Sequence, residues 1–240
     1  MTWIDRLHLF NSWDYAAVAL LFVAWQAIGV VIEHPGKRPS VSALTSAYRR
    51  DWMEQMLSRD PRIFDSQILG ILRQGTAFFA STCMIAIGGA LALIGNAERL
   101  DGLAQDLALE SEPIFVWEIK LLAVIILMID GFLKFVWSHR LFGYCAVVMA
   151  AVPNDPTDPA AHPRAMKAAE LNITAARSYN RGLRSIYFAM AAAAWLLGAI
   201  PLILAVLFTL AVLYRREFAS QSREALLAPE TDPAPKSETS

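Results

Sequence analysis

The chain has 240 residues, of which 56% are hydrophobic, and its mean hydropathy is +0.40. A water-soluble domain of this composition would expose large apolar patches, so we expect a membrane protein. The net charge is −1, and Lys and Arg gather in two loops, which argues against nucleic acid as a partner. The two cysteines, Cys83 and Cys145, lie in apolar runs and are expected to be buried thiols; their number excludes a secreted disulfide scaffold, although their spacing permits one bond.

Four apolar segments have the length of a membrane crossing, which takes about 20 mostly apolar residues as a helix. They lie near 15–32, 75–94, 117–137 and 187–214. We predict an all-α fold, a polytopic membrane helical bundle over residues 1–228 with about four transmembrane helices. Its cytoplasmic loops, 38–74 and 138–186, are expected to be helical, and the Pro-, Ser- and Thr-rich tail at 229–240 to be disordered.

The loops carry helical patterns of their own. Apolar residues recur at helical spacing over Val41–Leu57, which predicts a helix that either lies on the inner leaflet or packs on its neighbours. Asp60 and Pro61 resemble an N-cap and first helical residue, so the next helix is expected to start there and continue into the second segment. Leu141–Val152 is too short to cross again and is expected to extend the third helix or to be a buried cytoplasmic segment. Ala165–Leu183 is a further predicted helix.

The distribution of Lys and Arg predicts the orientation. The two predicted cytoplasmic loops hold 13 of these residues and the opposite side holds 6, so the positive-inside rule places both termini outside the cytoplasm. Arg215 and Arg216, directly after the fourth segment, disagree with this count. Pro201 predicts a kink in that segment, and a re-entrant hairpin folded at Pro201 would remove the disagreement.

The third segment carries charges where hydrocarbon penalises them. Asp130 and Lys134 are four residues apart on one helical face and can pair. A charge near the bilayer centre costs about 2.5 to 3.5 kcal/mol on insertion scales, so the pair is either a structural ion pair or part of an ion or proton pathway, to which Gln26 of the first segment would contribute. Glu118 and Lys120 lie at the outer end, where both side chains are expected to reach water.

Two further groups of residues are candidate interaction sites. Gly88 and Gly89 belong to a small-residue face of the second segment that favours helix packing. Arginines at the cytoplasmic helix ends are candidates for binding an anion or a lipid headgroup, because guanidinium recognises phosphate and carboxylate in a bidentate manner. They are Arg49, Arg50, Arg140, Arg177, Arg181 and Arg184. The positive-inside rule alone would also place arginines there.

Several runs together resemble an uncharacterised membrane-protein family, the domain of unknown function 599. They are Arg50-Asp51-Trp52-Met53, Arg62-Ile63-Phe64-Asp65, Phe78-Phe79-Ala80-Ser81-Thr82, Lys134-Phe135-Val136-Trp137-Ser138-His139-Arg140-Leu141-Phe142, Arg177-Ser178-Tyr179-Asn180-Arg181-Gly182-Leu183-Arg184 and Arg215-Arg216-Glu217-Phe218. The resemblance covers nearly the whole chain before the tail. It implies a bacterial multi-pass protein of the inner membrane and carries no catalytic role.

The chemistry-bearing residues leave three hypotheses. The four histidines form no metal-binding spacing, and the sequence has no nucleophile elbow, phosphate loop or dinucleotide fingerprint, so we expect no metal or cofactor and favour a non-enzymatic protein. The first hypothesis is a scaffold or subunit that forms a homo-oligomer or a larger membrane complex within the bilayer. The second is a small transporter or channel that uses Asp130 and Lys134. The third is an anionic-lipid-binding protein.

Overall fold

The computed structural model describes residues 8–34, 36, 38–96 and 113–229. Within this part of the chain every regular element is helical, which confirms the all-α prediction. The elements are α2 (Ser12–Glu33), α3 (Val41–Gln55), η1 (Met56–Ser58), α4 (Ile63–Ile94), α6 (Ile114–Ala150), α7 (Ala161–Ala193), η2 (Ala194–Leu197), α8 (Ala199–Phe218) and α9 (Gln221–Leu227). The predicted disordered tail, 229–240, lies outside the described residues from position 230 on.

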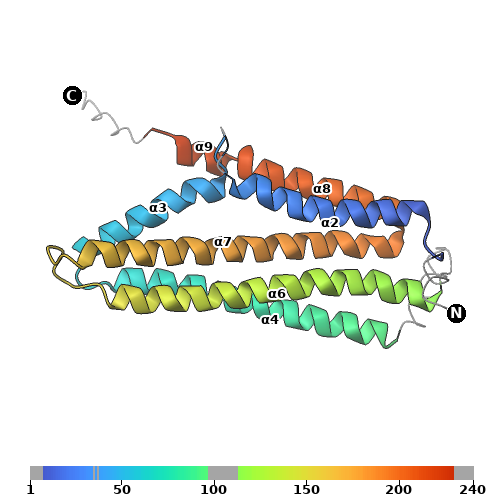
Figure 1. Cartoon of the computed structure of the whole chain (residues 1–240), viewed down its shortest axis with the longest axis horizontal. Helices are drawn as coiled ribbons and strands as arrows, with labels where there is room; N and C mark the ends of the chain where they lie inside the picture. Colours follow the sequence, from blue (N-terminus) through green and yellow to red (C-terminus); the bar gives the residue numbers. More distant parts are fainter. Residues whose placement is uncertain (1–7, 35, 37, 97–112, 230–240) are drawn as a thin grey trace, which may run out of the picture.

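The long helices lie side by side along one axis (Figure 1). Helix α6 packs between α4 and α7, while α2 packs against α8 and α7. Figure 1 shows α2 and α8 beside one half of α7 and α3 beside the other half. We call the half that contains α2 and α8 the apolar half, and the half that contains α3 the projecting half.

Helix lengths explain this division. At a rise of about 1.5 Å per residue, a helix of 20 to 22 residues measures about 30 Å, the thickness of a bilayer core. Helices α2 and α8 have 22 and 20 residues, whereas α4, α6 and α7 have 32, 37 and 33. Three described helical segments are long and apolar enough to cross a membrane. They are α2, Ser12–Glu33; α4, Ile63–Ile94; and Ala199–Leu227, which comprises α8 and α9. The three longest helices therefore extend well beyond the apolar half.

Each half has its own hydrophobic core. In the apolar half, α2, α6, α7 and α8 bury residues such as Leu21, Leu127 and Leu202. In the projecting half, α3, η1, α4, α6 and α7 bury a second cluster that includes Met53 and Phe142. Cys83 belongs to the first core and Cys145 to the second, and both are free buried thiols, as expected from the sequence.

The predicted fourth crossing is not a single helix. Helix α7 continues to Ala193, and the chain then reverses through η2 and Gly198, whose φ of +119° favours glycine. Helix α8 starts at Ala199 and runs back beside α7, so Pro201 lies in its first turn, where proline is tolerated, and produces no mid-helix kink. The prediction of one kinked helix over 187–214 was wrong, and the predicted hairpin is placed at Gly198 instead of Pro201.

The other loop predictions have mixed outcomes. Helix α3 with η1 matches the predicted helix over Val41–Leu57, and α6 runs on to Ala150, so the stretch after the third segment does extend that helix. The predicted N-cap at Asp60 and first helical residue at Pro61 were each wrong by two residues, because α4 begins at Ile63 with Arg62 at the N-cap position. Helix α4 then continues without a break to Ile94, as expected.

Candidate functional site

A polar layer separates the two cores. The Ser138 hydroxyl donates to the Ala175 carbonyl at 2.7 Å, and the Ser178 hydroxyl donates to the Lys134 carbonyl at 2.9 Å, so α6 and α7 exchange hydrogen bonds across this layer. Thr76 of α4 lies 3.1 Å from Nδ1 of His139, between the same two cores. Helix α2 ends at this level with Glu33. The layer therefore lies where the apolar half meets the projecting half.

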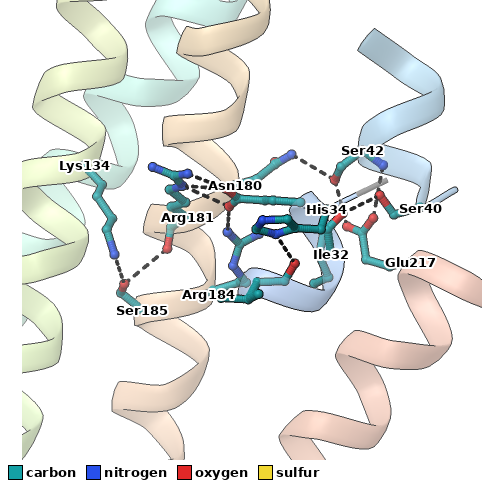
Figure 2. Close-up of polar contacts among 12 residues, drawn as sticks. Ile32, His34, Ser40, Ser42, Lys134, Asn180, Arg181, Arg184, Ser185 and Glu217 are labelled. Carbon is teal, nitrogen blue, oxygen red and sulfur yellow. Dashed lines mark hydrogen bonds and ion pairs between the residues drawn. The ribbon is translucent and has the colours of Figure 1, made fainter. Parts of the chain in front are cut away.

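Glu33 is the centre of an ion-pair network in this layer. Its carboxylate accepts hydrogen bonds from Nε of Arg181 at 2.9 and 3.0 Å, and it also pairs with a terminal nitrogen of Arg184. Figure 2 shows Arg181 and Arg184 projecting from α7 toward the end of α2, where Ile32 and His34 lie. Arg184 is buried, with a side chain 7% exposed, whereas the Arg181 side chain is 49% exposed. Burial of Arg184 depends on Glu33, since a buried charge needs a partner.

The start of α3 is fixed to this network by the residues that cap it. The Ser40 side chain accepts from the Ala43 amide and donates to the Ile32 carbonyl, which joins the first turn of α3 to the last turn of α2. The amide and hydroxyl of Ser42 donate to the two carboxylate oxygens of Glu217 on α8, at 3.1 and 3.0 Å (Figure 2). Asn180 of α7 donates to the Ser42 hydroxyl at 3.3 Å. Four helices therefore meet at one place.

A cavity of about 330 Å³ opens between the end of α2, α3 and α7. We call it the arginine pocket. Its lining includes four guanidinium groups and one carboxylate, from Arg49, Arg50, Arg177, Arg184 and Glu33. Hydroxyl and amide groups complete the polar lining, from Ser42, Thr45, Ser46 and Asn180. The pocket thus presents an excess of positive charge together with neutral hydrogen-bonding groups, which is the composition of an anion-binding site.

The four arginines differ in how their charge is balanced. Arg184 pairs with Glu33, and Arg50 pairs with Glu170 at 2.7 Å in an exposed ion pair. Arg49 bonds only to the neutral Asn172 side chain, and Arg177 has no hydrogen-bond or ion-pair partner among the described residues. Burial lowers the pKa of Arg49, because the charged form is desolvated without a carboxylate to offset it. An anion in the pocket would supply the missing negative charge.

Arg184 also separates the arginine pocket from two neighbouring cavities. One is a groove between α2, α6 and α7 lined by Trp25, Gln26, Lys134 and Glu33, and the other is a small cavity against α8 lined by Glu217. Arg184 lines all three spaces. A movement of this one side chain would therefore change all three cavities.

The structure brings the intramembrane candidates close to the network. Lys134 and Asp130 form an ion pair within α6, and the Ser185 hydroxyl also donates to Asp130. The Lys134 ammonium lies 5.0 Å from the centre of the Trp25 ring. Gln26 is exposed and lines the same groove as Lys134. Asp130 is bonded to both Lys134 and Ser185 within the bundle. The geometry therefore favours a structural ion pair beside the groove.

Other sequence candidates lie elsewhere. Arg140 is exposed on α6, where its terminal nitrogen donates to the Tyr144 hydroxyl at 3.0 Å, and it does not line the arginine pocket. Gly88 and Gly89 are exposed on α4, and a Cβ added at either would meet no atom within 4 Å. Lys120 was expected to reach water, but it is 2% exposed and its ammonium lies 5.3 Å from the Trp117 ring centre. That expectation was wrong, because the side chain points into the bundle.

Several polar residues of the site were missed by the sequence analysis, among them three that bond to its other side chains. Glu33, Glu217 and Asn172 all bond to arginines or to pocket-lining hydroxyls. Glu33 had a usable signal, since it is a lone acid at the very end of an apolar segment, where a buried arginine would need it. Glu217 and Asn172 had none, because they come from parts of the chain 175 and 123 residues away from their partners.

The arrangement is suited to binding. The described residues contain no group of His, Cys, Asp and Glu able to hold a metal ion. Cys145 lies near Asn172 and Arg49, but burial raises the pKa of its thiol to about 11, so the thiolate that a nucleophile requires is scarce. The arginine pocket offers guanidinium and hydroxyl groups around an open cavity.

The fold and the site together define an all-helical protein with membrane-length apolar helices and a cationic pocket where two of its cores meet. The chain belongs to the DUF599 family, described as proteins of unknown function, whose family model matches residues 16–222. This confirms the family expected from the sequence motifs. No curated protein and no solved structure matches the chain.

Proposed function

We propose that this protein binds the phosphate headgroup of an anionic lipid in the arginine pocket, at the cytoplasmic boundary of a bacterial inner membrane. The observation that carries the proposal is the charge balance of the pocket, in which four guanidinium groups face one carboxylate. Guanidinium groups bind phosphate oxygens through paired charge-assisted hydrogen bonds. Lipid binding thereby moves ahead of the scaffold and transport hypotheses, because its cavity carries an excess of guanidinium groups.

Membrane placement supports the choice of a lipid headgroup. If α2, α4, α6, the second half of α7 and α8 each cross the bilayer, the chain makes five crossings and its termini lie on opposite sides. Arg215, Arg216, Arg223 and Lys236 then move to the cytoplasmic side, and the count of Lys and Arg changes from 13 against 6 to 17 against 2. This is a stronger bias than the four-crossing arrangement gives. The arginine pocket, at the end of α2, would then lie at the level of the inner-leaflet phosphates.

The transport hypothesis keeps one specific observation in its favour. The groove that contains Gln26 and Lys134 shares Glu33 and Arg184 with the arginine pocket. A pathway along α2 would require the Glu33 and Arg184 pair to open. Its test is ion flux in reconstituted liposomes, where a flux that Lys134→Gln abolishes would support transport.

The scaffold hypothesis rests on α4, because few residues of its apolar part are buried within the structure. Gly88 and Gly89 have open space around them, so a partner helix has room to approach there. Native electrophoresis of Gly88→Leu tests this hypothesis. Unchanged assembly size would remove the main reason for a scaffold role.

Native mass spectrometry with a mixture of phosphatidylglycerol and phosphatidylcholine tests the lipid proposal. We expect the wild-type protein to retain phosphatidylglycerol selectively. Arg177→Gln should weaken this retention about tenfold, since a hydrogen bond to a charged group contributes about 1.5–3 kcal/mol and about 1.4 kcal/mol is tenfold in affinity. Arg49→Gln should act in the same direction.

Arg140→Gln provides the matched control. It removes one exposed arginine from the same cytoplasmic surface but not from the pocket. Equal loss of phosphatidylglycerol in Arg140→Gln and Arg177→Gln would mean that general surface charge, and not the pocket, attracts the lipid.

A further inference from the structure

A further cavity lies in the projecting half, between α4 and α6. It measures about 350 Å³, which is within the range of small-molecule sites. Its apolar wall includes Met56, Leu69 and Met149. Methionine side chains adapt to the shape of an apolar ligand. We call this space the α4–α6 cavity.

The polar groups of this cavity are cationic or neutral. Arg62, Ser66, Arg73 and Asn154 line it, and none of the residues that the structure places around it is acidic. An anion is therefore the charged group that the lining accepts. The arginine pocket shares no lining residue with this cavity.

Both arginines keep an unused donor. The buried Nε of Arg62 and that of Arg73 have no hydrogen-bond acceptor among the described residues. The terminal nitrogens of Arg62 donate to the carbonyls of Val152 and Pro153 at 2.8 and 2.7 Å, so this side chain is committed to the loop after α6. Within the part of the chain that the structure describes, the Arg73 guanidinium has one polar contact, 3.3 Å from a terminal nitrogen to Nε2 of His139. Arg73 is thus the guanidinium with capacity for a ligand.

The α4–α6 cavity extends away from the apolar segment of α4, which argues against a membrane lipid as its occupant. Arg73 lies two residues before Gly75, where the apolar segment of α4 begins, and Arg62 lies 11 residues earlier, roughly 16 Å away along the helix. A lipid with its phosphate on Arg73 would keep its chains in the bilayer and leave the cavity empty. A ligand that fills the cavity extends from Arg73 into the projecting half and so must be a soluble molecule.

We propose that the α4–α6 cavity binds a small cytoplasmic carboxylate with an apolar body, with the carboxylate on Arg73 and the body against Met56, Leu69 and Met149. Planar carboxylate matches the fork of donors on a guanidinium, and the apolar wall adds affinity in proportion to the area it covers. Ser66 and Asn154 at the far end can bond a second polar group of such a ligand.

The test uses 4-phenylbutyrate as the probe and the full chain in phosphatidylcholine nanodiscs, with empty nanodiscs subtracted. We expect saturable binding by isothermal titration calorimetry. The neutral analogue 4-phenyl-1-butanol and the variant Arg73→Gln should each weaken it at least about tenfold, as expected for loss of one charge-assisted hydrogen bond. Inorganic phosphate, which lacks an apolar body, should not compete.

Gly70→Leu tests the cavity without relying on Arg73. Gly70 lines the cavity, and a Cβ added there meets no atom within 4 Å, so a leucine can fill the space without a backbone clash. It should abolish probe binding, whereas Gly89→Leu, which is equally open but lies outside the cavity, should not change it.

The possible outcomes separate this proposal from the arginine pocket. Absence of saturable binding to the wild-type protein, or equal binding by Arg73→Gln, would overturn the proposal. Competition by added phosphatidylglycerol would assign the site to lipid headgroups and would also overturn it. Arg177→Gln should leave probe binding unchanged, so failure of one site does not imply failure of the other.

Discussion

At the scale of single residues, Glu33 binds two guanidinium groups of unequal exposure. Removing its charge with Glu33→Gln leaves the buried Arg184 without the carboxylate that bonds to it, and breaking a buried pair from one side costs about 3 kcal/mol or more. Arg181→Gln removes a side chain that is 49% exposed and should cost about 1 kcal/mol or less. Denaturant unfolding in mild detergent measures both. Equal costs for the two variants would show that Arg184 does not depend on Glu33.

The residues of the site were only partly predictable. The sequence identified Arg49, Arg50, Arg177 and Arg184 as a cationic group, because residue type and loop position suffice for that. The sequence did not identify which of these arginines share a cavity. Their grouping depends on how α8 runs back beside α7 and on the angle at which α3 leaves α2. Arg140 was grouped with them although it lies away from the pocket, because nearness in the sequence to a helix end does not determine which face a side chain occupies.

At the scale of helices, α6 and α7 are in tight contact at Gly182. A Cβ at this position would lie 2.9 Å from the ring of Phe135, which is fully buried and stacks on Phe79 with ring centres 5.4 Å apart. Gly182→Ala should therefore destabilise the protein by about 1–3 kcal/mol, the usual cost of overpacking. The unfolding midpoint in detergent checks this value.

Gly89→Ala is the control for that prediction. Its Cβ meets open space, and alanine favours a helix over glycine by about 1 kcal/mol, so stability should stay equal or rise. A loss as large as that of Gly182→Ala would mean that Gly89 is packed in the assembled protein, which would favour the scaffold hypothesis.

Element lengths were predictable where apolar runs ended at polar residues, as in α2, and where helical spacing continued through a loop, as in α4. The α7 and α8 boundary was not. The end of α7 is rich in alanine and is buried against other helices, so it joins the apolar run of α8 without a composition change. Only Gly198 marks the reversal, and one glycine in an apolar run is a weak signal.

At the scale of the whole molecule, the reversal at Gly198 changes the expected side of the C-terminus. Five crossings place it in the cytoplasm, opposite to the side that four crossings predict. A C-terminal green fluorescent protein fusion should fluoresce in bacterial cells, and a C-terminal alkaline phosphatase fusion should be inactive. A phosphatase fusion after Gly95, at the C-terminal end of α4 and thus on the outer side of the membrane, should be active. A dark green fluorescent protein fusion and an active phosphatase fusion at the C-terminus would restore the four-crossing arrangement, which predicts the same active fusion after Gly95.

The most direct test of the account is the affinity of the wild-type protein and two variants for dihexanoyl phosphatidic acid, a soluble lipid with a phosphate headgroup. If the headgroup replaces Glu33 as the partner of Arg184, Glu33→Gln should bind more tightly than wild type although it is less stable, because it removes a competing carboxylate. Arg177→Gln should bind about tenfold more weakly, through loss of one charge-assisted hydrogen bond. Weaker binding by Glu33→Gln, or unchanged binding by Arg177→Gln, would contradict the assignment of the arginine pocket as a headgroup site.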